Sequence, residues 1–250
     1  MKKKRKYRNT KFFKLGLIFF ILIFSRSLIT NYNNYQKNKA LEVRLISSSE
    51  EIEYIEDTFT VCIDPGHGDW DVGAIGIGGS YEKDIVLDIA LILGELLEAE
   101  GINVIYTRNN DELTWSDNST ENLYERVRIC EDNNSDIFIS IHCNSAGDSS
   151  EYKGVETWYN NKSYNSELLA TTIQEELSNI DYTEDRGIKF YDEDEPLAVL
   201  NNNSVPAALI ELGFISNWSD EDYLISDYGQ TTIAKAMFNA VINYKNSIEN

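Results

Sequence analysis

The sequence predicts a layered α/β fold, and two observations lead to this expectation. From Phe59 onward, short apolar runs alternate with segments whose apolar residues recur at helical spacing, a pattern typical of α/β layer architectures. The start of the 250-residue chain differs in composition from the rest. We therefore expect one folded domain, residues 59–247, after a non-globular beginning.

The predicted strands are short apolar runs bounded by polar residues or glycine. Their lengths are those of ordinary strands. Six segments meet this description: 59–64, 103–107, 136–142, 154–159, 198–200 and 207–211.

The predicted helices have apolar residues three or four positions apart, which places these residues on one helix face. The first helix opens at Glu82 and stops near Gly101, and Lys83 and Asp84 are expected on its surface. The same spacing predicts three further helices, in residues 120–130, 166–177 and 233–244.

Residues 1–30 combine a basic flank with an apolar run. Eight basic side chains lie within residues 1–14, and residues 15–24 are uninterrupted apolar sequence. This order is typical of a secretory signal sequence or an N-terminal membrane anchor. The run is shorter than the ~20 residues of a full span, but no small-residue cleavage site follows it, so both alternatives stay open. Either one predicts export of the remaining chain, with residues 31–58 as a polar linker.

Charge is distributed unevenly along the chain. Residues 1–44 hold 12 of the 22 Lys and Arg residues and one acidic residue, so residues 45–250 hold 10 basic against 41 acidic residues, a net charge of −31. A domain this acidic is repelled by nucleic acid and by anionic lipid. We therefore expect no nucleic-acid partner, and a membrane contact only through residues 1–30 if they are retained.

The cysteines and the other nucleophile motifs predict no covalent catalysis. Cys62, Cys130 and Cys143 have no CxxC spacing, and we expect buried apolar thiols rather than a structural disulfide. Cys143 adjoins His142, but adjacent strand residues point to opposite faces, so the two cannot form a thiolate–imidazolium pair. The chain contains no Gly-x-Ser-x-Gly elbow and no P-loop.

The chain contains only two histidines, and both follow or end predicted strands. His67 lies in a glycine-bordered loop after the first strand, and His142 ends the third. Glu82 follows His67 by fifteen residues, across a glycine-rich segment. Two imidazoles and one carboxylate match the three protein ligands of a catalytic zinc ion, which keeps a position for water. The alternative for Glu82 is a carboxylate favoured at a helix start by the macrodipole.

Glu211 ends the apolar strand 207–211 and is expected to be flanked by buried surface. A buried carboxylate needs a partner, so one interpretation is a salt bridge with Arg108, Arg126 or Arg186. The other is a general base that takes a proton from the attacking water and delivers it to a leaving nitrogen. Because ligands of open α/β sheets bind beyond the carboxyl ends of strands, parallel pairing would bring Glu211 to the same edge as both histidines.

Several blocks of the sequence resemble one family, in the family's order. The blocks are residues 63–68, 73–76, 82–83, 107–108, 140–145, 154–157, 186–187 and 206–217. They resemble the zinc-dependent N-acetylmuramoyl-L-alanine amidases of the amidase-3 type, and the resemblance covers about residues 59–246. One departure is Asp69-Trp70, which stands where relatives usually carry a glycine-containing pair.

The resemblance implies a three-layer α/β fold, in which helices flank a mixed, mostly parallel sheet of about six strands. It implies one Zn2+ ion held by His67, Glu82 and His142, with Glu211 as the catalytic glutamate and Asn144 as a substrate-binding residue near the metal. The implied reaction is hydrolysis of the amide between the lactyl group of N-acetylmuramic acid and L-alanine. Peptidoglycan is therefore the implied substrate, and the protein is expected outside the cytoplasm, membrane-anchored or secreted.

Two other functions remain as alternatives. A zinc peptidase acting on wall peptides would use the same metal chemistry. A catalytically silent wall-binding regulator would be expected to lack part of the site, whereas this chain keeps all four polar residues. The compact layout also resembles the amidases that process spore cortex.

Overall fold

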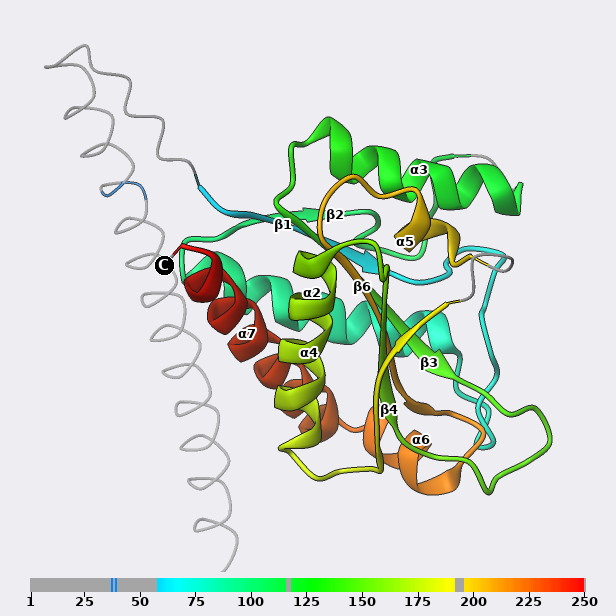
Figure 1. Ribbon diagram of the computed structural model, residues 1–250. Coiled ribbons are helices and arrows are strands. Elements are labelled where there is room, and N and C mark those ends of the chain that lie inside the picture. Colours follow the sequence, from blue (N-terminus) through cyan, green and yellow to red (C-terminus); the bar gives the residue numbers. More distant parts are fainter. Residues whose placement is uncertain (1–36, 38, 40–57, 116–117, 192–195, 250) are drawn as a thin grey trace, which may run out of the picture. The chain divides into compact units, whose positions relative to one another are not determined.

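The structure, a computed structural model, describes residues 37, 39, 58–115, 118–191 and 196–249 (Figure 1). The predicted signal sequence or anchor, residues 1–30, and nearly all of the predicted linker lie outside the described residues. Within the described ranges, no helix has both the length and the apolar composition needed to cross a membrane.

A six-stranded sheet forms the centre of the fold, in the order β2-β1-β3-β6-β4-β5. All neighbouring strands pair in parallel except β4 and β6, which pair antiparallel. The predicted mixed, mostly parallel sheet is therefore confirmed. Its strands are β1 (Thr60–Pro65), β2 (Asn103–Tyr106), β3 (Ile137–Asn144), β4 (Val155–Tyr159), β5 (Asp185–Phe190) and β6 (Ala207–Phe214).

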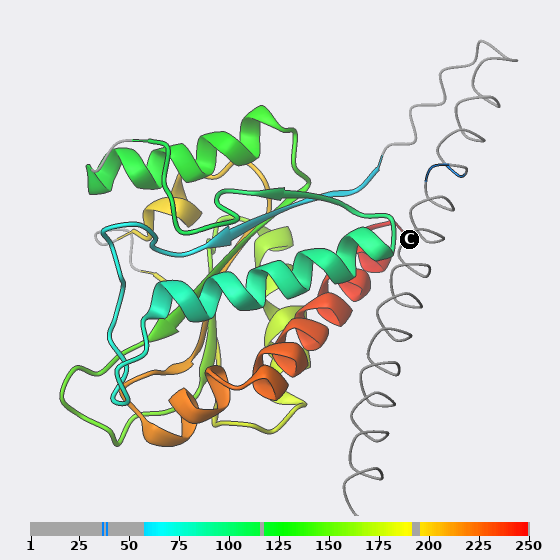
Figure 2. The ribbon, with the colours of Figure 1, turned by 180° about the vertical axis from the view of Figure 1, so that it is seen from behind.

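Helices cover both faces of the sheet, which confirms the three layers (Figure 1; Figure 2). One face carries α2 (Glu82–Ala99), α4 (Tyr164–Ser178) and α7 (Asp227–Ile248), which pack together. The other face carries α3 (Ser119–Asp132) and α5 (Ala198–Asn201). A further helix, α6 (Trp218–Leu224), follows β6.

Successive side chains of the buried strands point to opposite faces of the sheet, so the core consists of two apolar clusters. Ile137, Ile139 and Ile141 of β3 belong to the larger cluster, which α2, α4 and α7 cover. Phe138 belongs to the smaller cluster on the opposite face. Because side chains alternate along a strand, His142 shares the face of Phe138. The histidine is thus directed to the side of the sheet that α3 and α5 cover.

The predicted strand 198–200 was wrong, since these residues form the short helix α5. The main-chain N–H groups of Leu200 and Asn201 donate to the carbonyl oxygen of Leu197, at 3.0 and 2.8 Å. Val199 and Leu200 are buried against the smaller apolar cluster. A short apolar run does not distinguish a strand from a buried helical turn, so the tertiary contacts decided.

Strand β5 and helix α6 were not predicted. The sequence of β5, Asp-Arg-Gly-Ile-Lys-Phe, has little apolar alternation, and its end residues are exposed. An edge strand pairs on one side only and therefore leaves a weak signal. For α6, the available signal was the N-cap Asn217, whose side chain accepts hydrogen bonds from Ser219 N and Asp220 N. The three cysteines are free and buried, as predicted.

Candidate functional site

Four polar residues from separate parts of the chain lie together at one edge of the sheet. His67 follows β1, Glu82 begins α2, His142 lies in β3 and Glu211 lies in β6. Strands β3 and β6 are parallel neighbours, and their register places His142 opposite Glu211. Parallel pairing thus gathers residues near the carboxyl ends of strands at one place.

The possible ligand atoms of His67, Glu82 and His142 all lie within 4.8 Å of one another. Glu82 Oε1 is 3.1 Å from His67 Nε2 and 3.0 Å from His142 Nδ1. A tetrahedral zinc ion with ligands at about 2.0–2.1 Å holds neighbouring ligand atoms about 3.3 Å apart. The two separations between Glu82 and the imidazoles are therefore within about 0.3 Å of the spacing that such an ion requires.

Glu82 is held as an ionised carboxylate. Ala74 N donates to its Oε2 at 2.8 Å, and Cys143 N donates to its Oε1 at 2.9 Å. Burial alone would raise the pKa of Glu82, but hydrogen bonds and charge from His142 and His67 outweigh burial and keep this pKa well below its ordinary value. The carboxylate is therefore available as a ligand near neutral pH.

Asp71 fixes the orientation of His67. Asp71 Oδ2 lies 2.9 Å from His67 Nδ1, which leaves Nε2 directed at Glu82. Outer carboxylates of this kind set the tautomer and the ring orientation of metal-binding imidazoles. Burial opposes the charged ring, yet Glu82 and Asp71 together raise the pKa of His67. The position therefore favours positive charge, which a bound cation also supplies.

The loop after β1 has a strained backbone. His67 has a φ of 62° and Asp69 a φ of 54°, in the left-handed region that residues other than glycine seldom adopt. At Gly66, an added Cβ would lie 2.2 Å from His142 Cε1, so only glycine fits there. Such strain persists at functional sites when surrounding contacts over-determine the conformation.

Two buried arginines supply those contacts. Arg108 donates to the carbonyl oxygens of Pro65 and Gly66 at 2.9 and 2.8 Å. Arg126 donates to the carbonyl oxygens of Pro65 and His67 at 2.9 and 2.7 Å. A guanidinium group offers five N–H donors in a rigid fork, so each arginine binds two carbonyl groups of the loop.

Asp64 compensates the charge of Arg126 inside the protein. Its Oδ1 lies 2.7 Å from Arg126 Nη1, and its two oxygens also accept from Thr107 Oγ1 and Ser140 Oγ at 2.6 and 2.7 Å. Burial alone would raise the pKa of Asp64, but Arg126 and the two hydroxyl groups outweigh burial and lower this pKa. The pair is thus ionised and fully hydrogen-bonded in the core.

Glu211 has no ion pair with any described residue, and its buried Oε2 accepts no hydrogen bond from them. Of its three predicted alternative partners, the two loop-holding arginines bind carbonyl groups, and Arg186 Nε donates to Glu156 at 2.6 Å. Burial, followed by the charges of Glu82 and Glu156, raises the pKa of Glu211 well above its ordinary value. A carboxyl group with a raised pKa suits proton transfer.

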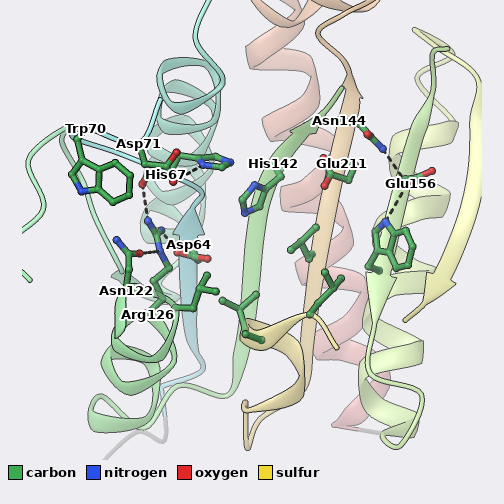
Figure 3. Close-up of a pocket in the computed structure, with 16 residues that line it drawn as sticks. Asp64, His67, Trp70, Asp71, Asn122, Arg126, His142, Asn144, Glu156 and Glu211 are labelled. Atoms are coloured by element: carbon green, nitrogen blue, oxygen red, sulfur yellow. Dashed lines mark hydrogen bonds and ion pairs between the residues drawn. The ribbon is translucent and has the colours of Figure 1, made fainter. Parts of the chain in front are cut away.

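An elongated cavity of about 520 Å³ opens over these residues. Trp70 lies at one end and Asn144 and Glu156 at the other, with His142 and Glu211 between them (Figure 3). Such a shape fits an extended ligand. The lining residues are Asp64, His67, Trp70, Asp71, Asn122, Leu123, Arg126, His142, Asn144, Glu156, Trp158, Leu197, Ala198, Val199, Leu209 and Glu211.

Asn144, expected as a substrate-binding residue, lines this cavity and donates to Glu156 Oε1 at 3.2 Å. Asp71 and Glu156 were not predicted as site residues. Glu156 carried a usable signal, because a carboxylate in a buried strand needs a partner. For Asp71, the only available signal was its spacing of four residues from His67.

The prediction that Lys83 lies on the surface was wrong. Lys83 is buried, and its Nζ donates to Asp111 Oδ2 at 2.7 Å and to the carbonyl oxygen of Asp69 at 2.9 Å. The helix start of α2 is therefore bound to the strained loop and to the segment after β2. Asp84 is exposed, as expected.

Residues 61–243 match the protein family described as N-acetylmuramoyl-L-alanine amidase. The chain belongs to this family. The predicted family is thereby confirmed, and it supports peptidoglycan amidase activity for this protein. All residues of the site described above fall within the matched range.

Bacillus subtilis (strain 168) has several relatives of the amidase. The uncharacterized protein YqiI is 37% identical over 206 residues, which are 82% of this chain and 93% of the relative. A germination-specific N-acetylmuramoyl-L-alanine amidase is 29% identical over 252 residues, which are 98% of this chain and 96% of the relative. The N-acetylmuramoyl-L-alanine amidase LytC is 37% identical over 190 residues, which are 74% of this chain but 35% of that longer protein.

Solved structures of Clostridioides difficile amidases have the same fold. An N-acetylmuramoyl-L-alanine amidase from strain 630 is 33% identical, with a TM-score of 0.69 over 76% of this chain and 98% of that one. The CwlD amidase, solved in complex with the GerS lipoprotein, is 32% identical, with a TM-score of 0.68 over 76% of this chain and 100% of that one.

Asp64→Asn is expected to destabilise the amidase by about 3–5 kcal/mol, because Arg126 is left buried without a counter-charge. A carboxyl group with a lowered folded pKa stabilises above its unfolded pKa of about 3.9, and this stabilisation is lost as the pH falls through the folded pKa. The variant should therefore lose less stability than the wild type as the pH falls, because it lacks the contribution of Asp64. Urea unfolding near neutral pH and in steps to about pH 3 measures both effects.

Asp132→Asn is the matched control, because Asp132 forms an exposed ion pair with Arg128. It should change the free energy of unfolding by less than about 1 kcal/mol. Equal stability of the Asp64 variant and this control would contradict the role given to the buried pair.

Gly66→Ala is expected to weaken metal binding about 10- to 100-fold, because the added methyl group displaces the His142 ring. Zinc titration against a competing chelator measures the affinity, and circular dichroism checks that the variant is folded. Gly147→Ala is the control: its φ of 61° makes the substitution strained, but no atom lies within 4 Å of the added Cβ, so it tests backbone strain without displacement of a neighbouring side chain. Unchanged zinc affinity of the folded Gly66 variant would refute the steric argument.

Proposed function

We propose that this amidase is zinc-dependent and hydrolyses the amide that joins the lactyl group of N-acetylmuramic acid to L-alanine in peptidoglycan. One observation carries the proposal. The ligand atoms of His67, Glu82 and His142 lie within 4.8 Å of one another, and Glu211, whose Oε2 has no hydrogen-bond partner among the described residues, lines the same cavity.

The donor set supports zinc as the metal. Two imidazole nitrogens and one carboxylate oxygen are a common set of protein ligands in catalytic zinc sites. Sets made only of oxygen atoms suit magnesium and calcium instead. The contact between Asp71 and His67 adds the outer carboxylate that such sites use. His67, Glu82 and His142 are therefore the proposed ligands.

When bound, zinc would polarise the scissile carbonyl group and acidify water. Glu211 is the proposed proton carrier, which takes a proton from the attacking water and delivers it to the leaving nitrogen of L-alanine. Burial raises the pKa of Glu211 and the charge of Glu82 adds to this effect, so neutralising that charge would lower this pKa. Asn144, which lines the cavity, is a proposed substrate contact.

The relatives support a role in the cell wall. One relative that aligns over nearly the whole chain is named a germination-specific amidase, and others are named cell wall amidases. We therefore place the activity outside the cytoplasm and propose spore cortex as the specific target. In this proposal residues 1–30 export or anchor the protein, residues 31–58 are a linker, and residues 59–247 are the catalytic domain.

Digestion of purified peptidoglycan tests the proposed reaction. The zinc-loaded protein should release peptides that begin with a free L-alanine amine and leave intact lactyl groups on the glycan, as mass spectrometry of the products shows. Plasma emission should find about one zinc ion per chain. Release of single amino acids would support a zinc peptidase. Folded, zinc-loaded protein that releases nothing would support a silent regulator.

Glu211→Gln is expected to retain zinc and to lower kcat at least ~100-fold, because the variant keeps the shape of the side chain but carries no titratable proton. His67→Ala is the comparison, and it should lose both zinc and activity. Plasma emission measures the metal, and the rate of appearance of L-alanine amines measures turnover. Near-normal turnover of Glu211→Gln would exclude Glu211 as the proton carrier.

A further inference from the structure

An exposed tryptophan stands at one end of the cavity. Trp70 is 54% exposed, lines the cavity and lies beside Asp71 and His67 (Figure 3). Single exposed apolar side chains are common on protein surfaces, so exposure alone indicates no function. The position of Trp70 does indicate a function, because this residue follows a proposed metal ligand by three residues and borders the same cavity.

The turn that carries this tryptophan is held in place. Gly68 N donates to Asp71 O at 2.9 Å, and Asp71 N donates to Gly68 O at 3.1 Å, which closes a tight turn. At its tip, Asp69 N donates to Asp111 O at 2.8 Å, and Asp69 O accepts from Lys83 Nζ. Because a tryptophan side chain has only two rotatable bonds, the ring is presented to a ligand with little loss of entropy.

The other tryptophan of the cavity is used by the fold itself. Trp158 Nε1 donates to Glu156 at 3.1 Å, and the ring packs against the smaller apolar cluster with Leu197 and Val205. Trp70 belongs to neither apolar cluster of the described residues. Of the two tryptophans that line the cavity, Trp70 is therefore the more exposed and the one that the apolar core does not use.

We propose that Trp70 is a stacking platform for a sugar ring of the glycan strand, which places N-acetylmuramic acid at the Trp70 end of the cavity and the peptide stem at the Glu156 end. This inference rests on the proposed function, in which the scissile amide separates a glycan half from a peptide half. A pyranose ring offers a face of C–H groups, which packs on an aromatic face while the hydroxyl groups stay free to form hydrogen bonds. Asn122 lies at the same end of the cavity; its Oδ1 accepts from Arg126 Nε at 2.8 Å, and its Nδ2 can donate to a hydroxyl group (Figure 3).

The opposite end of the cavity is polar. Arg186 and Lys189 of β5 lie 2.6 and 3.7 Å from Glu156 Oε2. Neither cation lines the cavity, but together they offset the charge of Glu156, which would otherwise repel the carboxylates of a peptide stem. An aromatic end and a polar, charge-balanced end therefore match the two halves of the substrate.

Two substrates that differ only in the glycan test the proposal with the full-length, zinc-loaded protein. One is a disaccharide–peptide, and the other is a lactyl–peptide without sugar. Trp70→Ala should lower kcat/KM about 10-fold for the disaccharide–peptide, mainly through KM, and leave the lactyl–peptide unchanged. Trp70→Tyr keeps an aromatic face and should retain most of the activity. Trp218→Ala removes a tryptophan of α6 that is 63% exposed, and it should affect neither substrate.

Equal losses on both substrates would show that Trp70 acts on the metal loop rather than on sugar, and no loss on either would also overturn the proposal. A second measurement needs no turnover. The disaccharide alone should quench the tryptophan fluorescence of the wild type and of Trp218→Ala, but not that of Trp70→Ala. If the wild type hydrolyses neither substrate but this quenching still depends on Trp70, the proposed reaction is wrong, whereas the proposal that Trp70 binds a sugar ring is supported.

Discussion

The buried ion pair between Asp64 and Arg126 is the interaction on which the site depends. Without the carboxylate, the charge of the guanidinium group would be buried without a counter-charge, and its bonds to the carbonyl oxygens of Pro65 and His67 would be weakened. Those contacts, with the ones from Arg108, hold a loop whose histidine has a left-handed backbone conformation. The interior of the domain thus decides where the first imidazole points.

Three glutamates share this edge of the sheet, and each has a different environment. Glu82 lies between two imidazoles, and Glu156 forms an ion pair with Arg186. Glu211 forms no ion pair with a described residue, and its burial, followed by the charges of the two other carboxylates, raises its pKa. The same residue type is therefore proposed as a metal ligand at Glu82 and as a proton carrier at Glu211, and it is a structural anion at Glu156; burial and neighbouring charges distinguish the three environments.

The sheet topology sets the order of groups across the cavity. His142 lies opposite Glu211 in the parallel pair β3–β6, and Glu211 lies opposite Glu156 in the antiparallel pair β6–β4. Because β4 runs antiparallel to β6, it begins at the edge of the sheet where β1, β3 and β6 end. Together with the turn that carries Trp70, this row gives the cavity two chemically different ends, which fits a substrate with two different halves.

Much of the fold and the convergence of the candidate site could be predicted from sequence, because the chain's two histidines and Glu211 follow or end apolar runs, with Glu82 at a helix start. Local sequence could not assign α5, the edge strand β5 or the burial of Lys83, whose partner Asp111 is 28 residues away. Nor could it show that Asp71 orients His67 or that the three arginines bind groups other than Glu211. Sequence alone indicated which residues are candidates for the chemistry. Their partners became visible in the folded chain, because contacts between distant segments set burial and electrostatic environment.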